Sequence, residues 1–363
     1  MRYLFYFAHP SHYYTLKPLM LKLSTGDHDI FLFIKTKDIL EDLVKESGFP
    51  FINISPTYRK TSTFSMVCDV IMRNMKFVKY IKKNKIERIV SCASDIGQAA
   101  RIHGIESFVF NDDDYFIVPK SAKYGWPFAS IIFAPRSCDM GLFQHKTVYY
   151  TGYQKLYYLH SNIFKPDIEK VKNHIGNGRY FLLRSVSLEA HHDNNVRGLS
   201  DEFIERIIKV LQPHGNVYIT SEKRLPENLE KYKLNINPID IHHYLYCADL
   251  LIGDSQSMVH EAAMLGTPSI RYNDFVGRIG VLEELERKYK LTIGISPDEP
   301  QKLFRTLEDL LANKNLKEVY KERREKMLSD MIDVNKFAFW FLQNYPDSYK
   351  EYKSNPDLQY RFK

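Results

Sequence analysis

The sequence predicts an α/β protein made of two parallel, doubly wound domains. Short apolar segments alternate with amphipathic helical segments from the N-terminus to about residue 135, and the alternation resumes near residue 179. A strand–helix rhythm of this kind is typical of a parallel sheet covered by helices on both faces. The chain has 363 residues, which is long for one domain and sufficient for two.

The first half of the chain carries the clearest alternation. Its strand segments are rich in aromatic and branched apolar residues, and two of its helices end at Gly48 and Gly104, as helices often do. The predicted strands are 2–8, 28–36, 51–55, 87–93, 106–111 and 130–135, and the predicted helices are 15–25, 38–48, 64–85 and 95–104.

The rhythm breaks over 149–167 and then restarts. In the second half the predicted strands are 179–184, 216–221, 248–252 and 268–273, and the clearest helices are 200–215 and 258–265. From about residue 300 the chain is helical and charged, with an aromatic segment over 336–345. We expect a Rossmann-like domain over 1–160, a second over 161–335, and a helical tail over 336–363. We also expect a cleft between the domains and a tail that packs back on the first.

Composition narrows the possible classes of function. The four cysteines are scattered singly, so neither a zinc site nor a disulfide framework is indicated, and a reduced cytoplasmic protein is the simplest interpretation. No segment approaches the roughly 18–20 apolar residues of a membrane span. The net charge of +7 suits anionic ligands. Nucleic acid is not expected as a partner, because no recognition motif accompanies the charge.

The segment GDSQSMVHEAAMLGTP, from Gly253 to Pro268, is the most informative. A polar turn follows a buried strand there and opens a helix that Gly266 ends. A helix N-terminus presents unpaired N–H groups and a partial positive charge, so a pyrophosphate fits there. Ser255 and Ser257 add hydroxyl groups, and Glu261 could reach a ribose diol. The alternative is ordinary helix capping without a ligand.

This segment resembles the nucleotide-sugar signature of GT-B enzymes. In UDP-N-acetylglucosamine 2-epimerases the signature has the form D-S-G-G-x-x-x-E-A, and plant-type UDP-glycosyltransferases have H-C-G-x-N-S-x-x-E. In both, the turn holds the pyrophosphate and the glutamate holds the ribose. The resemblance implies that role for Asp254, Ser255, Gln256, Ser257, Met258 and Glu261. Gln256 and Ser257 replace the two glycines of the epimerases.

A longer resemblance covers nearly the whole chain. FAHPSHYYTLKPLMLKL, YYTGYQKLYYLHSNIFKPD, LLRSVSLEAHHD, VYITSEKRLPENLEKY and LIGDSQSMVHEAAMLGTPSIRYNDFVGRIGVLEELERKY are similar to the domain-of-unknown-function 354 family. These are GT-B-like proteins whose genes often lie near surface-polysaccharide functions. The resemblance implies the GT-B fold and an enzyme or binding protein of polysaccharide or glycoconjugate biosynthesis.

Two residues near the N-terminus are catalytic candidates. Plant-type UDP-glycosyltransferases keep a catalytic histidine in the loop after the first strand, where this chain has His9 and His12 in HPSH. An imidazole can accept a proton from a sugar hydroxyl at neutral pH. Asp95, after the fourth predicted strand, matches the aspartate that partners this histidine in those enzymes. The structural alternatives are a capping histidine and an aspartate N-cap.

Further candidates follow other strands. Asp112, in the run Asn111–Asp114, is expected at the carboxyl edge of the sheet, without a metal, because GT-B enzymes usually lack one. We expect no cofactor. The loop over 184–193 is dense in polar groups after a strand. The remaining candidates for phosphate, sugar or acceptor contacts are Arg184, Glu189, His192, Asp193, Glu222, Arg271, Asn273 and Arg278.

These patterns favour a glycosyltransferase of the hexosyl- or N-acetylhexosaminyl-transferase type that uses a nucleotide sugar, expected to be UDP-linked. The acceptor would be a sugar, a glycan or a lipid-linked sugar. The basic helix over 72–85 is similar to the membrane-docking patch of the lipid II glycosyltransferase, which implies a cytoplasmic protein peripheral to the inner membrane face; ordinary packing on the sheet is the alternative.

Two other functions stay open. A 2-epimerase needs carboxylates, but its P-E-E-x-N-R segment corresponds to Pro119–Lys123 here, without either acid. A GT-B protein that binds a nucleotide sugar without catalysis is the third hypothesis.

Overall fold

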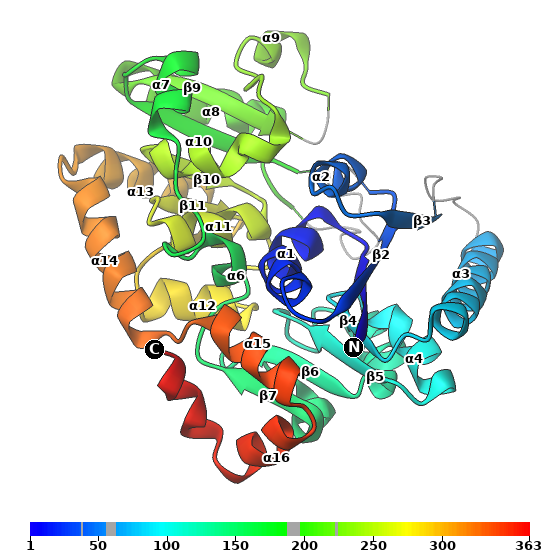
Figure 1. Ribbon diagram of the computed structural model, residues 1–363. Helices are drawn as coiled ribbons and strands as arrows, with labels where there is room; N and C mark the ends of the chain where they lie inside the picture. The colour runs from blue at the N-terminus through cyan, green and yellow to red at the C-terminus, as the bar shows by residue number, and fades with distance from the viewer. Residues whose placement is uncertain (38, 56–62, 187–196, 222–223) are drawn as a thin grey trace. The chain divides into compact units, whose positions relative to one another are not determined.

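A computed structural model describes residues 1–37, 39–55, 63–186, 197–221 and 224–363 (Figure 1). The chain divides into two compact units, and each has its own parallel sheet. Unit 1 comprises Met1–Tyr158 together with Met331–Lys363, and unit 2 comprises Leu159–Asp330. The predicted α/β class is confirmed.

Unit 1 is built on a seven-stranded sheet in the order β3-β2-β1-β4-β5-β6-β7. Every neighbouring pair of strands is parallel. Later strands are added outward on both sides of the β1–β4 pair, so the topological switch point lies between these two strands. The strands are β1 (Arg2–Phe7), β2 (Asp29–Lys35), β3 (Phe51–Ser55), β4 (Arg88–Ser91), β5 (Glu106–Phe110), β6 (Ile131–Pro135) and β7 (Thr147–Tyr150).

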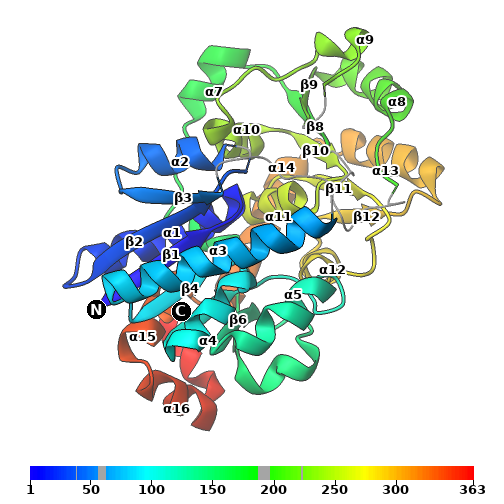
Figure 2. The same ribbon diagram turned by 90° about the vertical axis from the view of Figure 1, so that its right-hand side faces the viewer.

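Helices cover both faces of this sheet. The first six helices are α1 (Pro10–Ser24), α2 (Leu40–Glu46), α3 (Thr63–Asn84), α4 (Gly97–His103), α5 (Pro119–Tyr124) and α6 (Leu156–Leu159). Leu4 and Tyr6 of β1 share a core cluster with Phe77 and Ile81 of α3, and Figure 2 shows α3 running across this face. On the other face, the ring of Phe7 packs edge-on against Tyr13 of α1 at 5.6 Å. The alternation of side chains along β1 therefore supplies two cores.

Helix α1 begins five residues earlier than the predicted start at Thr15. His9 is its N-cap, and its side chain accepts a hydrogen bond from the N–H of Ser11. Pro10 stands in the first turn, where its missing N–H costs nothing. His12 therefore lies in the first turn of the helix. The sequence predicted it in the loop before the helix, so this prediction was wrong.

The C-terminal segment packs on unit 1, as predicted. It forms α15 (Val334–Asn344), α16 (Asp347–Ser354) and a 3₁₀ segment (Pro356–Phe362), and Figure 1 shows α15 and α16 beside β6 and β7. The buried guanidinium of Arg88 on β4 donates to the carbonyl of Leu342, to the carbonyl of Tyr345 at 2.7 Å, and to the hydroxyl of Tyr3 at 3.1 Å. One buried side chain thus joins the end of α15 to the sheet.

Unit 2 has a five-stranded parallel sheet in the order β12-β11-β10-β8-β9. Its strands are β8 (Tyr180–Ser185), β9 (Asn216–Ser221), β10 (Leu250–Gly253), β11 (Ser269–Tyr272) and β12 (Ile293–Ile295). Its helices are α7 (Ile168–Ile175), α8 (Asp201–Leu211), α9 (Glu227–Glu230), α10 (Ile241–Cys247), α11 (Gln256–Leu265), α12 (Gly280–Arg287), α13 (Pro300–Ala312) and α14 (Leu316–Asp330). The switch point lies between β8 and β10.

The core of unit 2 follows from the amphipathic spacing of its helices. Ile204, Ile207, Ile208 and Leu211 line one side of α8 and join a cluster that includes Ile252 of β10. Strands β7 and β12 were not predicted; β12 has only three residues, which are too few to show an alternating pattern. No helix in the described ranges is both long enough and apolar enough to span a bilayer.

Candidate functional site

The candidate site of unit 2 lies at the switch point of its sheet. β8 and β10 run parallel, with Arg184 opposite Gly253 at their carboxyl ends. A Cβ on Gly253 would lie 2.8 Å from the Cβ of Arg184, so only glycine allows the two strands to approach so closely. Ligands of doubly wound sheets bind where the strand order reverses, and the turn over 254–257 starts at this point.

Helix α11 begins at this turn. Ser255 is the N-cap, and its Oγ accepts from the N–H of Met258 at 3.3 Å. The N–H groups of Gln256 and Ser257 precede the first intrahelical bond, as at the start of any helix, and the side chain of Ser257 is exposed. The helix dipole adds partial positive charge to these donors. Met258 is buried, and its N–H is already used by the cap.

Asp254 and Asn273 hold this turn in place. The buried carboxylate of Asp254 accepts from the N–H groups of Val186 at 2.9 Å and Leu199 at 3.2 Å. Asn273 donates to the carbonyl oxygen of Asp254 at 2.8 Å. Burial raises the pKa of Asp254 to about 6, although the backbone donors oppose the shift. The polar atoms of both side chains are therefore bonded to the backbone, and the ligand contacts predicted for Asp254 and Asn273 stay a prediction.

Glu261 lies about one and a half turns into α11. Its side chain is almost buried, and its Oε1 lies 3.4 Å from Nε2 of His242 on α10. A carboxylate fixed in this way can accept two hydroxyl hydrogen bonds with little loss of side-chain entropy. The placement agrees with the ribose-binding role that the resemblance implies, and that role stays a prediction.

The three predicted arginines of unit 2 lie in different surroundings. Arg271 is fully buried and pairs with Glu283 at 3.2 Å. Arg278 is exposed and lies over the ring of Phe275. Arg184 is half-buried, and its charge lowers the pKa of Asp254. Arg271 therefore pairs with an acid, and its predicted contact with a phosphate or sugar stays a prediction.

Four further predicted residues, Glu189, His192, Asp193 and Glu222, lie outside the described residues.

Unit 1 brings its candidates to the carboxyl ends of β1, β4 and β5. His9 and His12 follow β1, Asp95 follows β4, and Asp112 follows β5. The β1–β4 pair is the switch point of this sheet. The sequence therefore located the correct edge of the sheet for these residues.

His12 is held as a neutral imidazole. Its Nδ1 accepts from the N–H of Ala8 at 3.3 Å, and its ring centroid lies 6.0 Å from that of His9. Burial, with smaller contributions from His9 and Lys155, lowers the pKa of His12 to about 3. A neutral imidazole can accept a proton, but the nearby ammonium group of Lys155 disfavours the charged product.

Asp95 makes its ion pair with Arg73 of α3, at 2.6 Å. It lies in a short 3₁₀ turn (Ser94–Ile96) and makes no side-chain cap. The pairing of Asp95 with His12 stays a prediction, since the charged groups acting on His12 are His9 and Lys155.

A buried polar cluster surrounds Asp112. The ammonium of Lys155 lies 3.3 Å from Oδ2 of Asp112. The amide nitrogen of Gln154, turned towards this carboxylate, donates to the same oxygen at 2.8 Å, and Cys92 lies on the other side of the amide. Burial raises the pKa of Cys92, so the thiol keeps its proton. Burial and the charge of Asp112 raise the pKa of Asp113 to about 7.

Sequence reasoning missed Lys155 and Gln154. Both stand in the aromatic segment YQKLYY after β7. A lysine inside such an apolar run is the only signal that could have indicated a buried charge. In the described part of the chain, no group of three or more potential metal ligands is present.

Comparison with known proteins shows the fold. No family model matches the chain, and no curated protein matches it in sequence. S. aureus MnaA, solved with UDP, matches at a TM-score of 0.65 and 12% identity over 96% of this chain and 97% of that chain. The Methanocaldococcus jannaschii UDP-GlcNAc 2-epimerase, solved with UDP-GlcNAc and UDP, matches at 0.61 and 14% over 90% and 100%.

Acinetobacter baumannii MurG matches at a TM-score of 0.59 and 13% identity over 94% of this chain and 99% of that chain. The predicted resemblance to 2-epimerases and glycosyltransferases is thus supported at the level of the fold, and membership of the domain-of-unknown-function 354 family stays a prediction. The chain has the two-unit GT-B fold that the sequence predicted.

Proposed function

We propose that the protein is a glycosyltransferase that binds a UDP-linked sugar in unit 2 and transfers the sugar to an acceptor hydroxyl. The observation that carries the proposal is the N-terminus of α11 at the switch point of the sheet, with Glu261 about one and a half turns into the helix and paired with His242. The GT-B neighbours solved with UDP or UDP-GlcNAc support the class of ligand.

The donor would be held by three kinds of contact. The diphosphate would accept hydrogen bonds from the N–H groups of Gln256 and Ser257 and from the exposed Ser257 hydroxyl. The carboxylate of Glu261 would accept from the ribose hydroxyls, with His242 fixing its orientation. Asp254 and Asn273 would contribute by keeping the turn in place, rather than by contact with the ligand.

Proton transfer would draw on unit 1. His12 is unprotonated at neutral pH, as a base must be, and Asp95 would orient it as in the plant-type enzymes. Asp113 is the second candidate, because a carboxyl group with a raised pKa is matched to proton exchange near neutrality. A pH–rate profile with an acidic limb near pH 7 that Asp113→Asn removes would assign the base to Asp113. A profile without that limb, together with loss of activity in His12→Ala, would assign it to His12.

A nucleotide-sugar 2-epimerase is the alternative function. The fold neighbours include such epimerases, and Asp112 and Asp113 supply carboxyl groups at the carboxyl edge of the unit 1 sheet. The segment over 119–123 lacks both acids of the epimerase P-E-E-x-N-R segment, which favours the transferase. A binding protein without catalysis is the third candidate.

One experiment separates these functions. The protein is incubated with UDP-GlcNAc and related nucleotide sugars in deuterated buffer, with and without sugar acceptors, and followed by NMR. A transferase releases UDP in an acceptor-dependent way and keeps the proton at C2. Deuterium at C2 without an acceptor would establish epimerisation instead, and binding with neither change would leave a non-catalytic protein.

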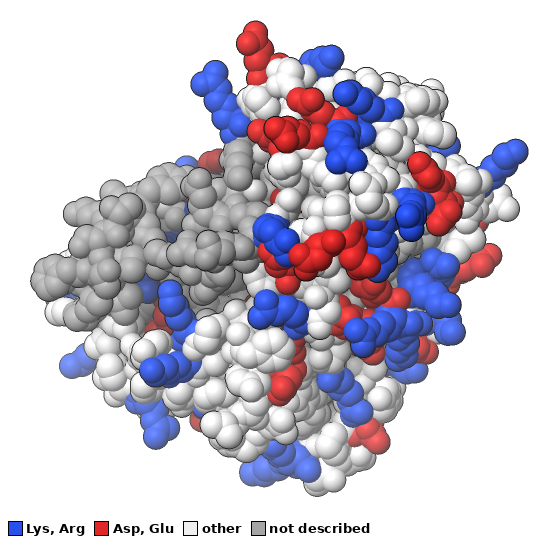
Figure 3. Space-filling model, turned by 180° about the vertical axis from the view of Figure 1, so that it is seen from behind, with Lys and Arg blue, Asp and Glu red and all other residues white. Residues whose placement is uncertain are grey.

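A lipid-linked acceptor and a peripheral position on the inner membrane face belong to the same proposal. On α3, Phe77 and Ile81 pack into the core, whereas Met72 and Met75 are exposed beside Lys76 and Lys79. Flotation with anionic vesicles tests this position, and Met72→Ser with Met75→Ser should weaken it. On the face in Figure 3, the coloured lysines and arginines lie among acidic side chains.

A further inference from the structure

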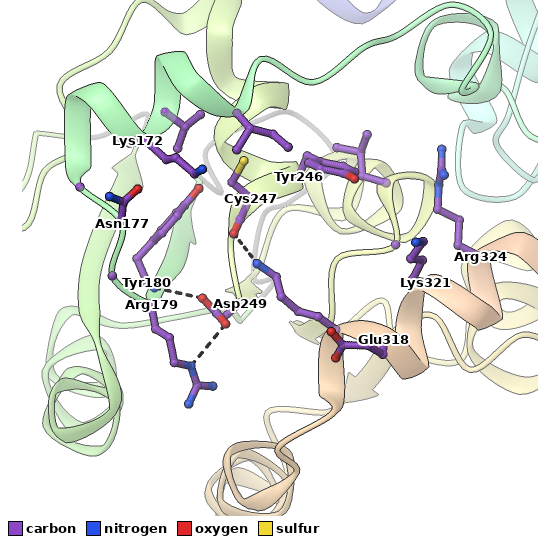
Figure 4. Close-up of a pocket in the computed structure, with 17 residues that line it drawn as sticks. Lys172, Asn177, Arg179, Tyr180, Tyr246, Cys247, Asp249, Glu318, Lys321 and Arg324 are labelled. Atoms are coloured by element: carbon purple, nitrogen blue, oxygen red, sulfur yellow. Dashed lines mark hydrogen bonds and ion pairs between the residues drawn. The ribbon is translucent and has the colours of Figure 1, made fainter.

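A pocket of about 510 Å³ opens in unit 2 at the edge where β8 and β10 begin (Figure 4). Its walls come from α7, the loop over 176–178, the start of β8, the end of α10 and one side of α14. The turn over 254–257 follows the opposite end of β10. The pocket is therefore separate from the proposed nucleotide-sugar site and shares no residue with the turn over 254–257.

The lining of this pocket is strongly basic. It contains five cationic side chains and two carboxylates, an excess of three positive charges. The cations are Lys172, Arg179, Lys317, Lys321 and Arg324, and the acids are Asp249 and Glu318. An excess of this size in one concavity attracts anions.

One of the two acids is already engaged. Asp249 pairs with Arg179 at 3.3 Å and accepts from the N–H of Tyr180 at 3.1 Å. The cations of α14 bond to neutral groups instead: Lys317 donates to the carbonyl of Cys247 at 2.7 Å, and Arg324 donates to the carbonyl of Met264 at 2.5 Å. These bonds fix the direction of the two side chains without neutralising their charge.

Cations from two separate elements converge on the same point. Burial raises the pKa of the Cys247 thiol, and the charges of Lys317 and Lys172 both oppose that shift, so both ammonium groups act on Cys247. Figure 4 shows Lys172 next to Cys247, with Lys321 and Arg324 farther along α14. Lys172 also pairs with Glu169 on its own helix at 3.2 Å, but such an exposed pair is weak.

In the loop over 176–178, which lines one wall of the pocket, only Asn177 carries a side chain. A Cβ on Gly176 or Gly178 would meet nothing within 4 Å, so the space beside the backbone is open. A compact anion can therefore enter beside Arg179 and Lys172. The volume lies within the range of small-molecule sites, roughly 300–1,000 Å³.

We propose that this pocket binds a phosphate-bearing ligand with at least two negative charges, held by Lys172, Lys317, Lys321 and Arg324. Lysine and arginine give charge-assisted hydrogen bonds to phosphate oxygens. The phosphate group belongs either to a soluble metabolite or to a lipid headgroup, and the two sources share the same chemistry.

Calorimetry with inorganic pyrophosphate at about 0.15 M salt, near physiological screening, tests the proposal. The pocket variant combines Lys317→Met with Lys321→Met. The matched control combines Lys314→Met with Lys326→Met, because both of these lysines are exposed and neither lines the pocket. We expect at least tenfold weaker binding in the pocket variant and unchanged binding in the control. Lys321→Glu, which keeps the Lys317 bond to Cys247, should weaken binding by itself, so a folding defect cannot imitate the result.

A second arm separates the two sources of phosphate. Vesicles of phosphatidylcholine with phosphatidylglycerol are sedimented with the same variants, and pyrophosphate is added as a competitor. Vesicle binding that depends on the pocket lysines and is displaced by pyrophosphate identifies a lipid headgroup, whereas pocket-dependent pyrophosphate binding alone identifies a soluble ligand. Equal binding by the pocket variant and the control, or no binding of either probe, would overturn the proposal. UDP affinity, measured on the same variants, reports separately on the proposed function.

Discussion

The ammonium of Lys155 lies 3.3 Å from Oδ2 of Asp112, and only 5% of the lysine side chain is exposed. This buried pair joins the segment after β7 to the carboxyl end of β5. Removing one partner of a buried pair leaves an uncompensated charge, which typically costs about 3–5 kcal/mol.

Lys155→Met should therefore lower the free energy of unfolding by about 3 kcal/mol, as measured by urea unfolding. The double variant Lys155→Met with Asp112→Asn is the control, because it removes both charges together. We expect the double variant to recover part of the loss. Equal stability of Lys155→Met and the wild type would show that the pair is not held in solution.

The imidazole of His12 should stay neutral far below the ordinary histidine range. Its pKa in the folded state is lowered from 6.5 to about 3 by burial and by the charges of His9 and Lys155. The unfolded chain therefore takes up this proton first, so the stability contributed by neutral His12 is lost as the pH falls from 6.5 towards 3. Histidine NMR titration should show His12 without protonation at pH 5. A ring that titrates near 6.5 would contradict this.

Substitution of Ser255 should change the stability of the protein, whereas substitution of Ser257 should change ligand binding. Ser255 caps α11, so Ser255→Ala should cost about 1 kcal/mol of unfolding free energy. Ser257 is exposed and makes no cap, so Ser257→Ala should leave the melting temperature unchanged while weakening UDP binding. Unchanged UDP affinity in both variants would place the diphosphate elsewhere.

Arg88 should be the main attachment of the C-terminal segment. Arg88→Met leaves two buried carbonyls and a tyrosine hydroxyl without their donor, a loss of about 3 kcal/mol. The control is Arg136→Met, which removes an exposed ion pair with Asp357 of the same segment and should cost less than about 1 kcal/mol. Urea unfolding and limited proteolysis after residue 331 measure both; similar values for the two variants would refute the attachment.

The sequence was informative where local pattern and chain order determine structure. The alternation of strands and helices predicted the parallel sheets, and GDSQS before an apolar helix predicted the strand–turn–helix unit, although the helix begins at Gln256, two residues before the predicted start at Met258. It also predicted which residues reach the carboxyl edges, because parallel strands all end at the same edge.

The partners of individual side chains could not be predicted in the same way. Asp95 pairs with Arg73, and Asp112 pairs with Lys155, across separations in sequence that no local pattern encodes. The buried environments of His12 and Asp113 likewise depend on tertiary packing. The carboxylate of Asp254 bonds to two backbone N–H groups, a contact that the sequence did not predict; its contact with a ligand stays a prediction.

The central claim, a nucleotide site at the start of α11, is tested most directly by calorimetric titration of UDP into the wild type and Glu261→Gln. Glu308→Gln, on the exposed side of α13, is the matched control. We expect one UDP per chain, with an affinity at least tenfold weaker in Glu261→Gln, about 1.4 kcal/mol, and unchanged in the control. UDP binding of equal strength in all three proteins would show that Glu261 does not contact the ribose. No UDP binding to the wild type would contradict the nucleotide site altogether.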